Sequence, residues 1–162
     1  MSTIENVRAY LAPFGLAEKI LEFPVSSATV ELAAQAAGVI PARIAKSLTF
    51  MLPDGPIIVV AAGDARIDNP KYKAQFHAKA KMLSFDEVPE AIGHAVGGVC
   101  PFAVRPGVRC WLDVSMKRFP SVYPACGSDN SAIELTPEQL ESAAQNCQGW
   151  IDVCKDWDPD LR

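Results

Sequence analysis

Histidine is scarce in this sequence of 162 residues, and the familiar cysteine pairs are missing. Only His77 and His94 occur, and the five cysteines include no C-x-x-C pair. An odd number of unpaired cysteines is typical of reduced thiols, and it argues against a disulfide framework or a zinc site. We therefore expect most of the cysteines to be small core residues.

Long apolar runs and an excess of positive charge are also missing. No hydrophobic stretch is long enough to span a bilayer, and the first residues, MSTIENVRAY, have neither the basic start nor the apolar core of an export signal. We expect a cytoplasmic protein with no membrane partner. With 15 basic and 19 acidic side chains, the net charge is −4, which excludes a general positive field for nucleic acid.

A nucleic-acid ligand would therefore need a local basic patch. Four lysines crowd one short segment and form a candidate: Lys71, Lys73, Lys79 and Lys81. The alternative is a solvated helix face. No Gly-x-x-x-x-Gly-Lys loop and no Gly-x-Gly-x-x-Gly motif is present, so nucleotide hydrolysis and dinucleotide binding lack their usual signals.

The signals that are present alternate between helix and strand. The length and the 49% hydrophobic content indicate one domain over residues 1–162. Ser2 with Glu5 forms a capping box for a first helix, and Thr29 begins a second that ends at Gly38. Further helices are predicted from Asn69, after Ser84 and from Thr136. Strands are predicted at 20–25, 43–52, 57–60, 109–113, 121–126, 132–135 and 149–154. The sum is a mixed α/β domain whose frequent hairpins predict a largely antiparallel sheet.

The strand RIAKSLTFML, residues 43–52, carries a lysine on an apolar side. Alternation places Lys46 in phase with Leu48, Phe50 and Leu52, the side that should be more buried. One explanation is that the lysine stem lies along apolar surface while the ammonium reaches water. The other is a cation at the rim of a pocket, aimed at a phosphate or an ester carbonyl.

The stretch GGVCPFAV, residues 97–104, places two glycines before a cysteine and a proline. Gly97 and Gly98 permit unusual φ and leave backbone N–H groups that can bind an oxyanion, although a plain turn has the same composition. Cys100 would need a histidine base to act as a nucleophile, and His94 lies six residues before it. We favour the interpretation in which Cys100 shapes the pocket and Pro101 stiffens the loop.

Two polar segments complete the candidate site. Asp113, in WLDVS, is a carboxylate in an apolar context that could orient Lys46 or a substrate ammonium, or simply cap the residues after it. The segment CGSDN is typical of a β-turn, with Ser128 lining the same cavity.

Taken in order, these segments resemble a known family, the YbaK-like, prolyl-tRNA synthetase-associated editing domains. The similarity covers roughly residues 20 to 145 and lies in the spacing of five segments: AKSLTF, VVAAGDARID, GGVCPFA, WLDVS and ACGSDNSAIELTPEQL. The resemblance implies a single compact α/β domain with a curved, mixed sheet flanked by helices. It also implies an aminoacyl-tRNA deacylase acting in trans, most simply on tRNA(Pro) that carries alanine, cysteine, serine, threonine or 2-aminobutyrate.

The resemblance also assigns roles to residues. Lys46 would hold the phosphate of the 3′-terminal adenosine or the aminoacyl carbonyl, and the loop from Gly97 to Pro101 would surround the ester. The residues expected to be catalytic are Lys46, Gly97 and Gly98, and those expected to bind substrate are Val99, Cys100, Pro101, Phe102, Asp113, Gly127 and Ser128. The attacking water would be assisted by the substrate itself, with no metal or cofactor. Cys100 departs from the family, which more often carries serine there, and this leaves the preferred amino acid open.

Two other functions stay open on the sequence. One is a non-catalytic module that binds tRNA or a synthetase through the Lys71 to Lys81 segment. The other is a redox-responsive protein, which predicts a Cys100 thiol of low pKa. A partner such as prolyl-tRNA synthetase could supply the recognition of the acceptor stem, because the acidic balance offers little binding energy.

Overall fold

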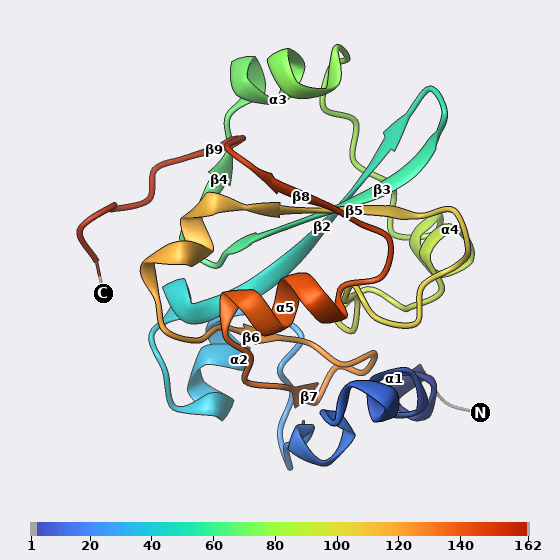
Figure 1. The fold of residues 1–162 in the computed structure, drawn as a ribbon, viewed down its shortest axis with the longest axis vertical. Helices are drawn as coiled ribbons and strands as arrows, with labels where there is room; N and C mark the ends of the chain where they lie inside the picture. The colour runs from blue at the N-terminus through green and yellow to red at the C-terminus, as the bar shows by residue number, and fades with distance from the viewer. Residues whose placement is uncertain (1–2, 162) are drawn as a thin grey trace.

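The N-terminal part of the chain forms two short helices that follow their sequence signals. Figure 1 shows the computed structural model, which describes residues 3–161. Helix α1 (Thr3–Leu11) continues as a 3-10 turn to Gly15, and α2 (Val30–Ala37) begins at Thr29, whose hydroxyl accepts a hydrogen bond from Leu32 N–H. Both helices are followed by a glycine with a φ of 73°. The predicted cap at Ser2 lies outside the described residues.

The predicted hairpin forms the centre of the molecule. Strand β2 (Ile44–Leu52) pairs antiparallel with β3 (Gly55–Ala62) across the turn at Pro53 and Asp54. Every residue from 57 to 62 is fully buried, because β3 has a partner strand on each side. This burial explains why the segment IIVVAA is a continuous apolar run.

The main sheet is mixed, as predicted, but it is not largely antiparallel. Its order is β6 (Tyr123–Pro124), β2, β3, β5 (Arg109–Asp113) and β8 (Cys147–Ile151). Only β2 and β3 are antiparallel there, and the pairs β2–β6, β3–β5 and β5–β8 are parallel. The prediction was wrong because long connections containing helices link β3 to β5 and β5 to β8, and turn signals do not identify distant partners.

Three further helices flank the curved sheet (Figure 1): α3 (Asn69–Phe76), α4 (Val88–Ile92) and α5 (Pro137–Ala143). Helix α3 begins at Asn69 as predicted, and hydrogen bonds at all three starts can be assigned. The Asp68 side chain caps α3, Ser84 and Glu87 exchange hydrogen bonds just before α4, and Thr136 forms a capping box with Gln139 at α5. No helix within residues 3–161 is both long and apolar enough to cross a membrane.

Short strands form two further sheets of two strands each. Strand β1 (Leu21–Glu22) pairs with β7 (Ser131–Ala132), and β4 (Arg66–Ile67) pairs with β9 (Cys154–Lys155). The strands predicted at 20–25, 121–126 and 132–135 are thus shorter than expected, and the one predicted at 149–154 becomes β8 and β9. A single large hydrophobic cluster runs from Val7 to Cys154, so the described residues form one compact domain.

Candidate functional site

A pocket of about 380 Å³ lies along the edge of β2. Four chain segments line it: residues within 27–33, 44–49, 82–99 and 123–132. These segments include the start of α2, the strand that carries Lys46, and the loop that carries Gly97. The structure therefore brings together two of the features that the sequence singled out.

The pocket occupies a gap in the pairing of β2. On this edge, β6 pairs with Ile44 and Ala45, and Met82 forms a bridge with Phe50. Within the described part of the chain, the residues between these points, 46–48, have no strand partner on this edge. Met51 N–H and Thr49 C=O form hydrogen bonds on this edge, so Ser47, which is in phase with them, is the residue of the open stretch whose N–H and C=O are available to a ligand.

Lys46 lines this pocket and is held by backbone oxygens. Its ammonium donates to the carbonyl of Ala65 and, at 3.3 Å, to that of Gly63. Burial lowers the pKa of Lys46 below its ordinary value, and the nearby Cys154 and Asp64 oppose that shift. The lysine is thus a fixed, partly buried group in the pocket rather than a mobile surface cation.

The turn that holds Lys46 is itself fixed. Asp64 forms a two-pronged ion pair with Arg118, with N···O distances of 2.9 and 2.6 Å, and the Arg118 side chain is only 3% exposed. At Gly63, a Cβ would lie 2.1 Å from the carbonyl oxygen of Pro41, so only glycine fits. These contacts keep both carbonyls aimed at the lysine.

The glycine loop lies against the turn at Gly127. A Cβ on Gly98 would lie 2.6 Å from the carbonyl carbon of Gly127, and the Gly127 N–H donates to Gly98 O at 3.0 Å. Gly97 has a φ of 98° and lines the pocket, as does Val99. Two predicted segments far apart in sequence therefore meet beside the pocket.

One predicted oxyanion donor is already in use. The N–H of Gly98 donates to Ala95 O at 3.0 Å, so Gly98 holds the loop in shape rather than facing a ligand. The N–H groups of Gly97 and Val99 have no partner among residues 3–161. These two are the better candidates for contact with an oxyanion.

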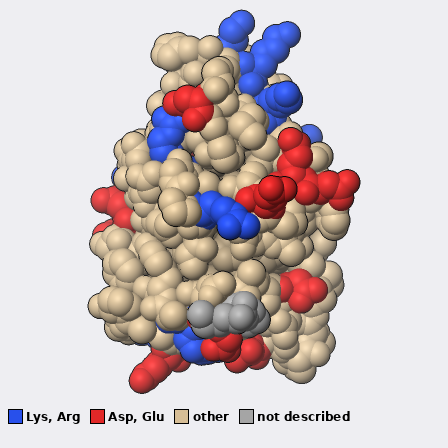
Figure 2. Space-filling model, turned by 90° about the vertical axis from the view of Figure 1, so that its right-hand side faces the viewer, with Lys and Arg blue, Asp and Glu red and all other residues tan. Residues whose placement is uncertain are grey.

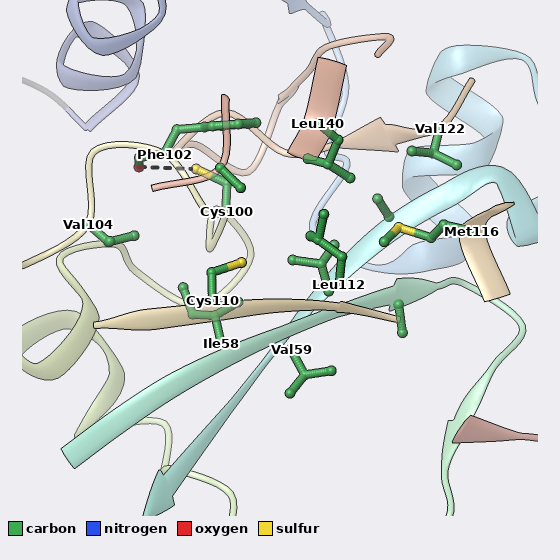
Figure 3. Close-up of a cluster of buried hydrophobic side chains, with 14 of the residues drawn as sticks. Ile58, Val59, Cys100, Phe102, Val104, Cys110, Leu112, Met116, Val122 and Leu140 are labelled. Atoms are coloured by element: carbon green, nitrogen blue, oxygen red, sulfur yellow. Dashed lines mark hydrogen bonds between the residues drawn. The ribbon is translucent and has the colours of Figure 1, made fainter. Parts of the chain in front are cut away.

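Cys100 and Phe102 are core residues and do not line the pocket. Both are 0% exposed, and Figure 3 shows Cys100 among the buried side chains with its contact to the Phe102 carbonyl. Pro101, also buried, accepts a hydrogen bond from Gln145 N–H. The predicted substrate contacts of these three residues stay predictions, and in this structure the three consecutive residues are buried and anchor the loop to the core.

The structure places Cys100 beside a histidine, but the pair is not suited to nucleophilic catalysis. The Cys100 Sγ lies 3.5 Å from Nε2 of His94, which is 1% exposed. Burial raises the pKa of Cys100 to about 12 and lowers the pKa of His94. Both shifts favour the neutral forms, which argues against a thiolate nucleophile and against a redox role for Cys100.

Asp113 has the capping role that the sequence allowed. It is fully buried, and its two oxygens accept 2.9 Å hydrogen bonds from the N–H groups of Ser115 and Val153. It begins the 3-10 helix Val114–Arg118 and is not a lining residue of the pocket.

Gly127 and Ser128 lie behind the pocket lining. The Ser128 side chain forms hydrogen bonds with those of Asn130 and Ser131. The substrate contacts predicted for Asp113, Gly127 and Ser128 stay predictions, and in this structure the three residues are not among those that line the pocket.

The four lysines divide into two groups. Lys71 forms an ion pair with Asp152 at 3.0 Å, whereas Lys79 and Lys81 are exposed on the segment that leads to Met82 at the pocket. Lys73 is exposed on α3. Figure 2 shows basic side chains at the end of the molecule that carries α3.

Several lining residues escaped the sequence interpretation. Three apolar side chains at the pocket are exposed: Met82 by 58%, Phe85 by 73% and Val96 by 46%. Three serines, Ser27, Ser47 and Ser131, also line it. Ser47 follows Lys46 in the predicted strand and could have been noticed, but the rim segments have no periodic pattern. Among the described residues, no group of three or more His, Cys, Asp and Glu side chains is placed to hold a metal ion.

This combination of a curved α/β sheet, a lysine-bearing pocket and a glycine loop defines an editing-domain architecture. The sequence profile of the aminoacyl-tRNA editing domain matches residues 25–143, and the chain belongs to this family. It is 51% identical to the uncharacterized protein YwhH of Bacillus subtilis (strain 168), over 96% of this chain and 99% of that one. The resemblance to the editing family is thereby confirmed.

Solved structures agree with this fold. A structure described as that of a candidate trans-editing enzyme for prolyl-tRNA synthetase superposes with a TM-score of 0.85 at 28% identity, covering 96% of this chain and 98% of that one. The structure of hypothetical protein APE2540 gives a TM-score of 0.82 at 28% identity, covering 93% and 99%. The predicted single domain with a curved mixed sheet is thus confirmed.

Proposed function

We propose that this chain, with residues 1–162 acting as one editing domain, hydrolyses mischarged aminoacyl-tRNA in trans. The observation that carries the proposal is the fixed Lys46 in a small pocket of a member of the editing family. The similarity to a structure described as a trans-editing enzyme for prolyl-tRNA synthetase supports tRNA(Pro) as the RNA. The reaction would take place in the cytoplasm, where charged tRNA is used.

The pocket suits a small aminoacyl group. Its volume of about 380 Å³ can hold an aminoacyl group, and the small side chains of Ala28, Ala45 and Ala132 form part of its lining. When two amino acids differ by one methylene, a synthetase pocket discriminates between them by only about 1–3 kcal/mol. Amino acids of nearly the same shape as proline are therefore attached by mistake, and a second, hydrolytic site is needed to remove them. Alanine, cysteine, serine, threonine and 2-aminobutyrate are the candidates.

The chemistry assigns the polar groups to the ester. Water adds to the ester carbonyl, the bond from the carbonyl carbon to the ribose oxygen breaks, and that oxygen takes up a proton. Lys46 would hold the carbonyl or the adjacent phosphate, and the N–H groups of Gly97 and Val99 would stabilise the developing oxyanion. Neither histidine lines the pocket. The free ribose hydroxyl of the substrate, or the thiol of a cysteinyl group, would therefore assist the attack.

The pocket mouth suits the end of a nucleic acid. Met82, Phe85 and Val96 are exposed there, and an exposed aromatic ring beside apolar side chains is typical of a surface on which a base stacks. Lys81 directly precedes Met82 and Lys79 lies two residues before Lys81, so both could contact phosphates. The terminal adenosine would thus lie at the rim while its ester enters the pocket.

The test is release of amino acid from tRNA(Pro) charged in turn with alanine, cysteine, serine, threonine, 2-aminobutyrate and proline. We expect the wild type to hydrolyse at least one non-cognate ester, and Lys46→Ala to lower kcat/KM by about 100-fold or more, as for loss of one charge-stabilising donor. Lys19→Ala, on the exposed 3-10 turn Ala17–Lys19, is the matched control. Full activity in a folded Lys46→Ala variant would contradict the role of the lysine.

A second candidate is a module that binds tRNA or prolyl-tRNA synthetase without catalysis. The exposed basic residues at the α3 end favour it. Tight, salt-sensitive tRNA binding with no release of any amino acid would support this function over hydrolysis. Hydrolysis that appears only after prolyl-tRNA synthetase is added would instead show that a partner supplies tRNA recognition.

A further inference from the structure

Arg118 is a buried cation beside the turn that holds Lys46. It lies in the 3-10 helix after β5, and its side chain is only 3% exposed. The guanidinium donates four hydrogen bonds: to Ser115 O at 2.8 Å, to Asp158 O at 3.0 Å, and to the two carboxylate oxygens of Asp64 at 2.9 and 2.6 Å. A planar group bound at so many points has one orientation, and its burial is tolerated because its charge is paired.

Two aromatic rings complete the surroundings of this guanidinium. Its central carbon lies 4.7 Å from the centre of the Phe119 ring and 5.0 Å from that of the Trp157 ring. Trp157 is partly exposed and belongs to the segment 156–161, which follows β9 and is dark red in Figure 1. The same segment supplies the carbonyl of Asp158. A cation over aromatic faces is attracted to them, so this segment helps to fix Arg118.

Asp64 connects Arg118 to the lysine. It stands between Gly63 and Ala65, whose carbonyl oxygens accept hydrogen bonds from the Lys46 ammonium. Its carboxylate forms its ion pair with Arg118. Because the backbone has two soft dihedral angles per residue, a rotation at Asp64 changes the relative direction of the two carbonyls. The ion pair that restrains Asp64 therefore also restrains the two acceptors of the lysine.

A second contact joins the same 3-10 helix to the turn. The Oγ of Ser115, a fully buried residue, accepts a hydrogen bond from Ala62 N–H at 3.1 Å. Ala62 directly precedes Gly63, and Ser115 is also the residue whose carbonyl accepts from Arg118. The helix thus contacts the turn at its start as well as at Asp64.

Lys46 depends on the two carbonyls for its direction. Within residues 3–161, its ammonium donates hydrogen bonds only to Gly63 and Ala65. Four ionisable groups act on its charge without a hydrogen bond to it: Glu31, Asp64, Arg66 and Cys154. A polar group acts well in a site only when its neighbours hold it within about 0.5 Å of the productive position. The contacts behind the turn supply that support.

We propose that Arg118 and Trp157 are positioning residues for Lys46. The indole fixes the guanidinium, the guanidinium fixes Asp64, and the turn then keeps the ammonium directed. Neither Arg118 nor Trp157 lines the pocket, and Trp157 lies beyond residues 25–143, which the family profile matches. The expected effect on catalysis rests on the proposed deacylation, whereas the expected effect on Lys46 itself does not.

The first measurement follows the Lys46 side chain by NMR. Lysines are isotopically labelled at Cε, Lys46→Ala assigns the signal, and the order parameter of the Cε–H bonds is compared with that of the exposed Lys19. We expect Trp157→Ala to lose about half of the excess order of Lys46 over Lys19, and Trp157→Phe, which keeps a ring on the guanidinium, to lose little. Arg118→Lys should resemble Trp157→Ala, because one ammonium cannot bind the carboxylate as a fork.

The second measurement is kcat and KM for hydrolysis of mischarged tRNA(Pro). Trp157→Ala should lower kcat about 10- to 100-fold and change KM by less than about twofold, because a small displacement of a catalytic group weakens the transition state more than binding. Trp157→Phe should restore most of kcat. Trp150→Ala is the matched control: Trp150 is also partly exposed and also contacts a cation, Lys117 at 4.6 Å, but it does not line the pocket.

Three results would overturn the assignment. Unchanged order of Lys46 in a folded Trp157→Ala variant would remove the link to the lysine, and unchanged kcat with a more mobile Lys46 would remove the link to catalysis. An equal loss of kcat in Trp150→Ala would make the effect one of general stability. If the wild type hydrolyses no ester, the proposed function fails, and the NMR comparison still decides whether Trp157 orders Lys46. Melting curves show which variants are folded, and Arg118→Lys tests the same link if Trp157→Ala is not.

Discussion

Cys100 illustrates how a residue can be adjacent to a site without belonging to it. Its neighbours Val99 and Gly97 line the pocket, but its own sulfur lies in the core with Phe102. Its place in the loop made it a candidate for substrate contact, but Cys100, Pro101 and Phe102 are all buried, so this part of the loop turns into the core. A serine at this position would be a change in packing rather than in the pocket lining.

We expect Cys100 to be inert to alkylation in the folded protein. Complete burial and a pKa raised to about 12 leave almost no accessible thiolate at pH 8. Of the five free thiols, only that of Cys147 is partly exposed, so it should be modified first. Mass spectrometry of peptides after iodoacetamide treatment measures the order. Rapid modification of Cys100 under native conditions would restore the redox hypothesis.

Gly98 should tolerate no side chain, because backbone atoms fill the space. Gly98→Ala places a Cβ 2.6 Å from Gly127 C and 2.7 Å from Ser128 N, and we expect a loss of about 2–3 kcal/mol in the free energy of unfolding. Urea unfolding at 25 °C measures it. Gly107→Ala is the control: its φ is 90° but no atom lies within 4 Å, so about 1 kcal/mol is expected. Equal losses would show that the close approach has no effect.

Elements with local signals were predicted well, and those that depend on distant contacts were not. The starts of α2, α3 and α5 follow from Thr29, from Asn69 with Pro70 in the first turn, and from Thr136, since such signals involve residues a few positions apart. The parallel pairing of β5 and the shortness of β7 depend on strands far away in sequence. The same division holds for the site: Lys46 followed from strand alternation, whereas Ser27 and Phe85 lie on irregular segments that only the fold brings to the pocket.

The segment between α3 and α4 should carry tRNA contacts. Lys79 and Lys81 are exposed and lead to the rim, whereas Lys71 is paired with Asp152. We expect Lys79→Ala with Lys81→Ala to weaken tRNA binding and to reduce the slope of log affinity against log salt by about 1.5 to 2. Lys71→Ala should have a smaller effect, and Lys19→Ala none. Filter binding between 50 and 200 mM salt, concentrations at which phosphate contacts are strongly screened, measures these slopes.

If the double variant leaves the slope of log affinity against log salt unchanged, the tRNA binds to another part of the molecule. A slope lowered equally by Lys71→Ala would show that the whole basic group acts together. In either case the pocket assignment would be unaffected, because Lys46 reaches it from β2 and not from this segment.

Stability of the whole molecule should fall in mild acid because of His94. Burial lowers the pKa of His94 in the folded state, so the unfolded state binds more protons once the pH drops below about 6.5. The stabilisation is therefore complete above that pH and declines below it, by up to about 1.4 kcal/mol per pH unit. The lowered pKa values of Glu87 and Glu134 act below about 4.5, which leaves pH 5 to 6.5 to the histidine.

Urea unfolding at pH 7.5, 6.5 and 5.5 measures this effect. In His94→Gln, which removes the titrating group but keeps a polar side chain near the Phe102 carbonyl, the decline from pH 6.5 to 5.5 should largely disappear. A variant that loses stability over this interval as steeply as the wild type would contradict the assignment to His94.

The gap in β2 pairing also bears on how copies of the chain behave in concentrated solution. An exposed strand edge is a template on which another chain can add a strand, which is a common start of self-association. Here the open stretch covers only residues 46–48, between β6 on one side and the bridge from Met82 on the other, and it contains a lysine. A strand from another molecule would find too few backbone groups to form hydrogen bonds. It would also have to displace the charged Lys46 side chain. The structure thus leaves backbone groups open to a small ligand while offering a neighbouring molecule almost no strand edge to pair with.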